Sequence, residues 1–157
     1  KLFRAVTNAC LQSGRRGLLL ARHVDQIPAN LPPEVRHFTY VSLRRLLPHC
    51  SAIVHHGGIG TTAKSLAAGT PQLIIPHAWD QLDNACRVER LGAGVTLRRR
   101  HVSVSRLANG IDCLERPTVG EQCHRIAGRF PATDPMDRAC EWIEELARDA
   151  QPVRARG

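Results

Sequence analysis

Residues 55–62, HHGGIGTT, place two histidines, three glycines and two threonines directly after an apolar run. Gly57, Gly58 and Gly60 allow the backbone to turn sharply and to approach a ligand without an intervening Cβ. A strand that ends in such a turn and continues into a helix directs free backbone N–H groups and the positive end of the helix dipole at one point. The pattern therefore predicts a site for an anion such as a phosphate.

Side chains of the same stretch supply further donors. His56 can donate from its ring, and Thr61 and Thr62 can cap the helix or donate their hydroxyls to phosphate oxygens. The alternative is structural, because single glycines and threonines more often only form tight turns and capped helices. Their coincidence at the end of one strand favours the anion site.

A carboxylate and a carboxamide stand side by side at Asp80 and Gln81, just beyond the next apolar run, QLIIP (72–76). Together they offer acceptors and donors, which suits the neighbouring hydroxyls of a sugar. The alternative for this pair is a cap on the helix that follows.

Residues 58–63 also match G-x-G-x-x-A, the dinucleotide fingerprint, and Asp80 lies about 20 residues further on, as the ribose-binding acid should. In that fold the acid ends the next strand, whereas Asp80 lies four residues beyond Pro76, where QLIIP ends. A nicotinamide-dependent oxidoreductase is therefore an alternative of lower rank.

Short apolar runs alternate with helical stretches along the chain. We expect strands at 18–21, 36–41, 52–56, 72–76 and 95–98, and helices at 2–11, 42–50, 61–69, 82–92, 103–115, 119–129 and 134–149. Continuously apolar strands separated by helices predict an α/β, Rossmann-like fold: a parallel sheet with helices on both faces. Ligands bind outside the carboxyl ends of such strands, which is where HHGGIGTT falls.

Composition narrows the function classes. The 157 residues suit one domain, which we place at 1–150 with a polar tail at 151–157. The formal charge of +8 favours an anionic partner, but only 4% of residues are aromatic and LRRRH (97–101) is the one dense basic run. We interpret that run as a solvated strand end and expect no nucleic-acid partner.

The six cysteines are scattered without a C-x-x-C pair, so we expect free thiols and no metal site. No apolar run reaches the roughly 18 residues of a membrane span, and the N-terminal segment lacks a leader pattern. We expect a cytoplasmic protein.

Residues 46–94 resemble the donor-binding signature of inverting GT-B glycosyltransferases, which include plant small-molecule glucosyltransferases and bacterial antibiotic and sterol glycosyltransferases. The motifs H-x-G-x-x-T, A-G-x-P and P-x-x-x-D-Q occur in that order, at residues 56–61, 68–71 and 76–81. Within the group, the sequence is most similar to bacterial rhamnosyltransferases of the rhamnolipid type.

The resemblance implies roles for ten residues in binding a nucleotide sugar. The diphosphate would be bound by His56, Gly58, Gly60, Thr61 and Thr62. The sugar hydroxyls would be bound by Asp80 and Gln81, with Trp79 lining the pocket unless it only packs. The base would stack on Tyr40, unless Tyr40 is a core aromatic, and would bond the backbone of Val41.

The resemblance also implies that this chain is the C-terminal half of a GT-B fold. The family's first donor-domain strand, its acceptor-binding domain and its catalytic base are not in this sequence, so the chain alone should be inactive. The implied donor is a UDP- or dTDP-hexose, with dTDP-rhamnose among the candidates. The acceptor is a small-molecule or lipid hydroxyl, which allows peripheral membrane contact, and no metal or other cofactor is needed. A nucleotide-sugar epimerase of the same architecture is an alternative, but it would require acid and base residues that we do not find.

One departure from the family pattern concerns the ribose. Lys64 stands where plant members carry a Glu that binds the ribose hydroxyls. An ammonium only donates hydrogen bonds, so discrimination against a deoxyribose should be weak. We expect Lys64 in the first turn of its helix, either directing charge toward the diphosphate or facing solvent.

Overall fold

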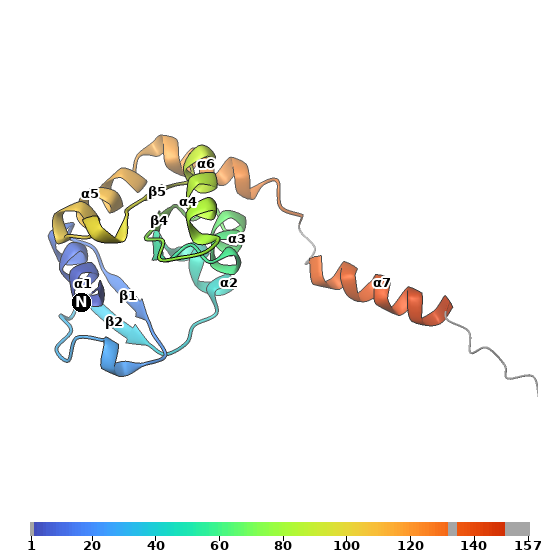
Figure 1. Ribbon diagram of the computed structural model, residues 1–157, viewed down its shortest axis with the longest axis horizontal. Helices are drawn as coiled ribbons and strands as arrows, with labels where there is room; N and C mark the ends of the chain where they lie inside the picture. Colours follow the sequence, from blue (N-terminus) through green and yellow to red (C-terminus); the bar gives the residue numbers. More distant parts are fainter. Residues whose placement is uncertain (1, 132–134, 150–157) are drawn as a thin grey trace, which may run out of the picture.

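Strands and helices alternate along the computed structural model, which describes residues 2–131 and 135–149 (Figure 1). The strands are β1 (Gly17–Leu20), β2 (Val35–Phe38), β3 (Ile53–His55), β4 (Gln72–Ile74) and β5 (Gly94–Thr96). The helices are α1 (Leu2–Gln12), α2 (Leu43–Leu46), α3 (Ile59–Ala67), α4 (Gln81–Arg90), α5 (Val104–Leu114), α6 (Pro117–Ala127) and α7 (Pro135–Asp149). Each expected element is present, with ends displaced by a few residues.

All strand pairs are parallel, but the strands form two sheets instead of the single sheet expected. β1 pairs with β2, and the second sheet has the order β3-β4-β5. The connection from β2 to β3 contains α2 and a 3₁₀ turn at Leu47–His49, and no hydrogen bonds join the two strands. The α/β class is as predicted, and the carboxyl ends of β3 and β4 lie at one edge.

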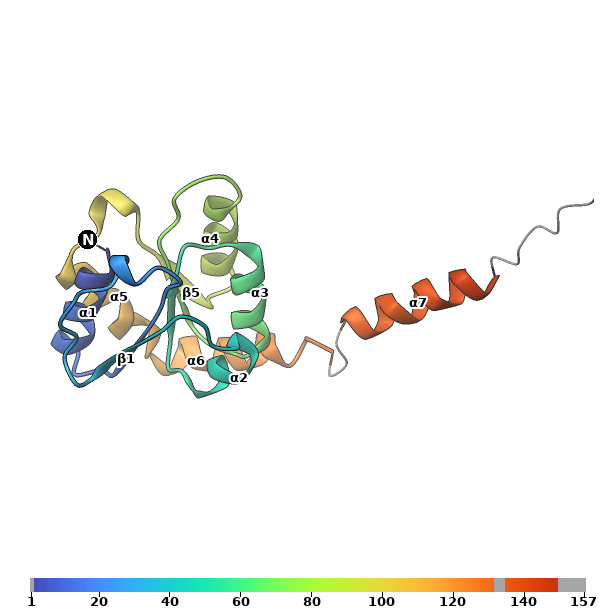
Figure 2. The same ribbon diagram turned by 90° about the horizontal axis from the view of Figure 1, so that it is seen from below.

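Helices cover both faces of the three-stranded sheet, as Figure 2 shows. Leu73 and Ile75 pack with residues of α1 and α5 on one face, while Ile74 packs with residues of α4 and α6 on the other. Successive side chains of a strand point to opposite faces, so a strand buried on both sides is apolar without alternation. This burial explains the run QLIIP and fixes β4 as the centre of the domain.

Helix α7 stands apart from the other elements in both views (Figures 1 and 2). Its apolar side chains Met136, Trp142, Ile143 and Leu146 are exposed, and the Arg138 guanidinium lies 5.1 Å from the Trp142 ring centre. The predicted tail at 151–157 lies outside the described residues. None of the helices described is both long enough and apolar enough to span a membrane.

A pair of polar side chains links β3 to β4 beneath the glycine-rich stretch. His55 Nε2 lies 3.0 Å from Gln72 Oε1, and the Gly57 N–H donates to His55 Nδ1 at 3.1 Å. Because Nδ1 accepts, Nε2 carries the proton and donates to Gln72. Burial lowers the pKa of His55 to about 4, so its ring is neutral at neutral pH.

Replacing Gly94 should disrupt the sheet. A Cβ at this position would press on the Gln72 carbonyl oxygen and lie 2.8 Å from Val88 Cγ1. Gly94→Ala should therefore lower the free energy of unfolding by about 3 kcal/mol, as overpacking in a core does. Gly120→Ala is the matched control, because a Cβ there meets nothing within 4 Å; it should raise stability by up to about 1 kcal/mol. Urea denaturation of both variants tests the difference, and similar effects would contradict the packing described.

The pKa of His55 makes stability dependent on pH. Between the ordinary value of 6.5 and about 4, the unfolded chain binds a proton at His55 that the folded chain does not. The free energy of unfolding should therefore fall as pH decreases through this window, by at most about 1.4 kcal/mol per pH unit for this one group. In His55→Asn this part of the pH dependence should be missing. Urea denaturation between pH 7 and 4.5 compares the two proteins, and parallel curves would refute the assignment.

Candidate functional site

The backbone turns at Gly57, two residues after the end of β3. Gly57 is buried with a φ of +92°, and an added Cβ would lie 2.8 Å from Ile74 Cγ2 and 3.1 Å from the Gln81 carbonyl oxygen. Its N–H donates to His55, and its C=O accepts a hydrogen bond of 2.9 Å from Asn84 Nδ2. The glycine is required here by both conformation and space. We call residues 56–60 the glycine turn.

Free backbone donors gather where the glycine turn enters α3. Gly58 is the N-cap, and α3 begins at Ile59, two residues earlier than expected. In the described chain, the N–H groups of Gly58, Ile59 and Gly60 have no partner. A Cβ on Gly60 would meet nothing within 4 Å, so the space beside Gly60 is open. Three free N–H groups and the helix dipole together can bind an anion.

The two threonines differ from each other. The Thr62 hydroxyl donates to the Gly58 carbonyl at 3.1 Å, and the residue is 4% exposed. The predicted roles of Thr62 as a cap and as a hydroxyl donor to a ligand therefore do not fit this geometry. The backbone N–H groups of Thr61 and Thr62 also bond to Gly58, at 3.1 and 3.0 Å. The Thr61 side chain is half-buried, and its hydroxyl has no hydrogen bond to the described residues.

His56 lies beside the start of α3. Its ring is exposed, and a Cβ added to Gly58 would come within 2.7 Å of His56 Nε2. The rings of His55 and His56 are 6.4 Å apart and nearly perpendicular. His55 thus holds the glycine turn through its bond to the Gly57 N–H, while His56 is exposed beside the start of α3.

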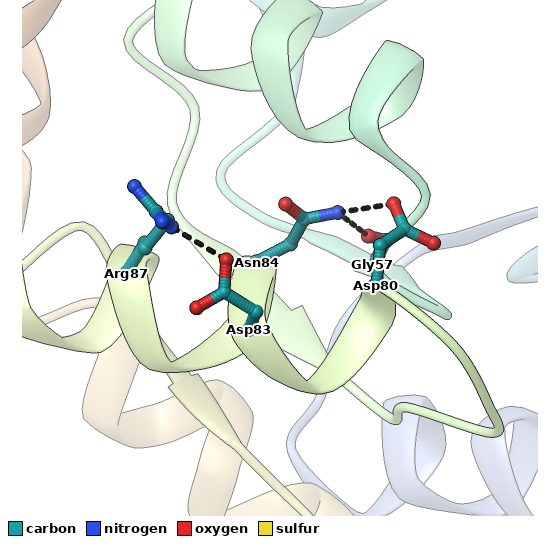
Figure 3. A network of polar contacts seen from close by, with 5 residues as sticks. All are labelled: Gly57, Asp80, Asp83, Asn84 and Arg87. Atoms are coloured by element: carbon teal, nitrogen blue, oxygen red, sulfur yellow. Dashed lines mark hydrogen bonds and ion pairs between the residues drawn. The ribbon is translucent and has the colours of Figure 1, made fainter.

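Asp80 is connected to the glycine turn through Asn84 (Figure 3). Asn84 Nδ2 lies 2.9 Å from Asp80 Oδ2 as well as 2.9 Å from the Gly57 carbonyl oxygen. Asp80 occupies the N-cap position of α4 but makes no side-chain capping bond, so the capping alternative does not describe its carboxylate. Asp80 is exposed, and its other oxygen is available to a ligand.

The loop before α4 presents the remaining predicted sugar contacts. Gln81 Oε1 accepts from the N–H groups of His77 (2.8 Å) and Ala78 (3.2 Å), which leaves the amide nitrogen of Gln81 to donate. Trp79 is 83% exposed and has a φ of 62°. Within the described chain, Trp79 is therefore not packed in the core.

Tyr40 and Val41 lie after β2, which ends at Phe38 instead of continuing to residue 41. Tyr40 is 83% exposed, so it is not a core aromatic. Val41 is half-buried, and neither its N–H nor its C=O bonds to the described residues. No hydrogen bond joins this pair to the glycine turn within the described chain.

Lys64 is the sixth residue of α3 and is exposed. The expectation that it lies in the first turn is wrong, because the helix begins two residues earlier than predicted. Lys64 therefore lies in the last turn of α3 and not beside the free N–H groups at its start.

Sequence reasoning missed His55, Gln72, Asn84 and the Ile59 backbone. The partners of the three side chains are distant in sequence or carry no local motif. One signal was present: Asn84 is a polar residue on the apolar face of its helix, next to buried Ala85 and one turn before buried Val88. A buried polar side chain on such a face must have hydrogen-bond partners.

No metal centre is formed within residues 2–131 and 135–149, where no three His, Cys, Asp or Glu side chains are grouped to hold an ion. A hollow of about 540 Å³ lies beside residues 24–31 and His37, away from the glycine turn. The predicted site is instead an open surface at the carboxyl ends of β3 and β4.

Comparison with known proteins identifies relatives. The family model for the C-terminal domain of erythromycin biosynthesis protein CIII-like proteins matches residues 18–140. Aklavinone 7-beta-L-rhodosaminyltransferase of Streptomyces galilaeus is 45% identical over 132 residues, which are 82% of this chain and 30% of that protein. Aclacinomycin-T 2-deoxy-L-fucose transferase of the same organism is 37% identical over 131 residues, 81% of this chain and 30% of that protein. The chain thus spans about a third of the length of these curated relatives.

A solved structure supports the same assignment. Glycosyltransferase VinC in complex with dTDP superposes with a TM-score of 0.77 at 29% identity, covering 93% of this chain and 37% of VinC. The relatives named here are glycosyltransferases, and none is a rhamnolipid enzyme. The chain therefore belongs to the family of erythromycin biosynthesis protein CIII-like C-terminal domains, and its fold is the C-terminal half of a GT-B glycosyltransferase.

Proposed function

We propose that the chain is the donor-binding domain of an enzyme that transfers a deoxysugar from a dTDP-sugar to a hydroxyl acceptor. The observation that carries the proposal is the set of three free N–H groups at Gly58, Ile59 and Gly60, next to the exposed carboxylate of Asp80. The dTDP complex of VinC and the names of the Streptomyces relatives support this donor class.

The donor would lie across the carboxyl ends of β2, β3 and β4. In this arrangement the diphosphate accepts hydrogen bonds from the three backbone N–H groups, His56 and the Thr61 hydroxyl. Asp80 accepts from sugar hydroxyls, the Gln81 amide nitrogen donates to one, and Trp79 lines the pocket. The base stacks on Tyr40 and bonds the free backbone groups of Val41.

The proposed reaction is a single displacement with inversion. The acceptor oxygen forms a bond to the anomeric carbon while the bond from that carbon to the diphosphate oxygen breaks, and its electron pair leaves with the diphosphate. The acceptor proton passes to a base that we assign to the rest of the enzyme. Donors fixed before the reaction stabilise the developing charge by a few kcal/mol each, so the scheme uses no metal or other cofactor.

The acceptor in this proposal is a small-molecule or lipid hydroxyl, so the whole enzyme can make peripheral membrane contact. We also propose a cytoplasmic location, since all six cysteines are free thiols. Burial raises the pKa of Cys10, Cys50 and Cys123, so these thiols remain protonated at neutral pH.

The two alternatives find less support. Asp80 lies six residues beyond the end of β4 and bonds Asn84, unlike the strand-end acid of a dinucleotide site. No relative named above is an oxidoreductase or an epimerase.

The Gly60→Ala variant separates binding from stability. Its Cβ would enter the open space that we assign to the diphosphate, so the affinity of the chain for dTDP should fall at least tenfold in calorimetry. Thermal stability should stay the same or rise, because Ala exceeds Gly by about 0.5–1 kcal/mol inside a helix. Gly120→Ala is the matched control with unchanged affinity. If Gly60→Ala binds dTDP with wild-type affinity, the proposal that the diphosphate binds at this site is wrong.

The nucleotide preference follows from Lys64. With no acceptor at this position, UDP and dTDP should bind within about tenfold of each other, and Lys64→Glu should shift the preference toward UDP. Calorimetry with both nucleotides and both proteins tests this. A wild-type preference for UDP of more than about tenfold, roughly 1.4 kcal/mol, would show that another residue binds the ribose and would favour a UDP donor.

A further inference from the structure

Asn84 uses both hydrogens of its amide inside the site. The residue is 8% exposed, and Nδ2 donates to the Gly57 carbonyl and to Asp80 Oδ2, each at 2.9 Å. Both partners are acceptors, so the amide must present its nitrogen to them and not its oxygen. Figure 3 shows the Asn84 side chain reaching between Gly57 and Asp80.

The bond to Gly57 acts directly on the anion site. The Gly57 carbonyl and the Gly58 N–H belong to the same planar trans peptide group and point in opposite directions. Holding the oxygen therefore fixes the direction of the Gly58 N–H, the first of the three free donors. A hydrogen bond accepted by the carbonyl also polarises the N–H of the same group.

The rest of the turn leaves little freedom for this peptide group. The Gly57 N–H is held by the neutral His55 ring, and the Cα of Gly57 faces Ile74 and the Gln81 backbone without room for a side chain. The Asn84 amide is the contact that holds the remaining, carbonyl end of Gly57, which belongs to the same peptide group as the Gly58 N–H. The other acceptor of the same amide is the carboxylate proposed to bind the sugar.

We propose that Asn84 is a positioning residue that couples the sugar end of the donor to its diphosphate end. It orients the Gly58 N–H toward the diphosphate and the Asp80 carboxylate toward the sugar, so the two parts of the donor bind cooperatively. This inference rests on the proposed function for its ligands, whereas the orientation of Gly58 can be measured without any ligand.

The first experiment measures the affinities of dTDP and dTDP-glucose by calorimetry for wild type, Asn84→Asp and Asn84→Ala. Asn84→Asp keeps the size of the side chain but turns oxygens toward two acceptors. It should weaken dTDP binding about tenfold or more, and at least as much as Asn84→Ala. If Asn84 only fills space, the isosteric variant should be the milder one.

Asp83→Asn is the matched control. Asp83 is the neighbouring residue on α4, and its carboxylate is 58% exposed in an ion pair with Arg87 that points away from Gly57 (Figure 3). This variant should bind both ligands as wild type does. Equal losses in the Asp83 and Asn84 variants would overturn the inference.

A double-mutant cycle tests the coupling. The quantity compared is the ratio of the dissociation constants of dTDP and dTDP-glucose, which measures the affinity gained from the sugar. This ratio should fall both in Asp80→Ala and in Asn84→Ala. In the double variant it should fall no further, because both changes break the same connection. Independent, additive losses would contradict the coupling.

Nuclear magnetic resonance of the free chain distinguishes failure of this inference from failure of the proposed function. The Gly58 amide signal should shift in Asn84→Ala and Asn84→Asp but not in Asp83→Asn. If wild type binds neither ligand while the Gly58 signal behaves as expected, the proposed function fails and the positioning of Gly58 stands. An unmoved Gly58 signal overturns the role of Asn84 whatever the affinities show.

Discussion

Two residues after β3, Gly57 adopts a left-handed conformation that is fixed by the contacts around it. The Cα faces Ile74, a fully buried core residue of β4, while the N–H and C=O are bound by His55 and Asn84. The direction of the next peptide groups, and so of the three free N–H donors, follows from this one constraint. The proposed anion site is therefore anchored in the hydrophobic core.

The side chains that hold the turn are neutral. The lowered pKa of His55 keeps its ring uncharged, Gln72 and Asn84 are amides, and Lys64 lies away from the free N–H groups. Oriented backbone dipoles at the start of α3 contribute positive potential at the proposed site. Such dipoles need little reorganisation when a leaving diphosphate gains charge, which suits the proposed displacement.

The sequence was sufficient for what depends on local pattern. Periodicity located the strands and α-helices of the described residues, and the glycines marked the turn after β3, but the run 97–101, interpreted as a strand end, follows β5 and includes a 3₁₀ turn at Arg99–His101. It did not predict the start of α3 at Ile59, because Gly60 disfavours a helix by propensity. The separation into two sheets and the partners of Gln72 and Asn84 depend on contacts between distant residues, for which one sequence carries no direct signal. Asn84 could have been singled out only as a polar residue on an apolar helical face.

The loop between β4 and α4 is built differently from the turn beside it. Residues His77, Trp79 and Asp80 are exposed, and the Gln81 side-chain oxygen bonds the backbone of His77 and Ala78. The exposed side chains of His77 and Trp79 can be replaced without touching the packing around Ile74, whereas Asp80 is tied to Gly57 through Asn84. Under the proposed function, enzymes of this family could diverge in sugar preference through these exposed residues while keeping the glycine turn unchanged. The same fold would then be shared by related enzymes that form different products.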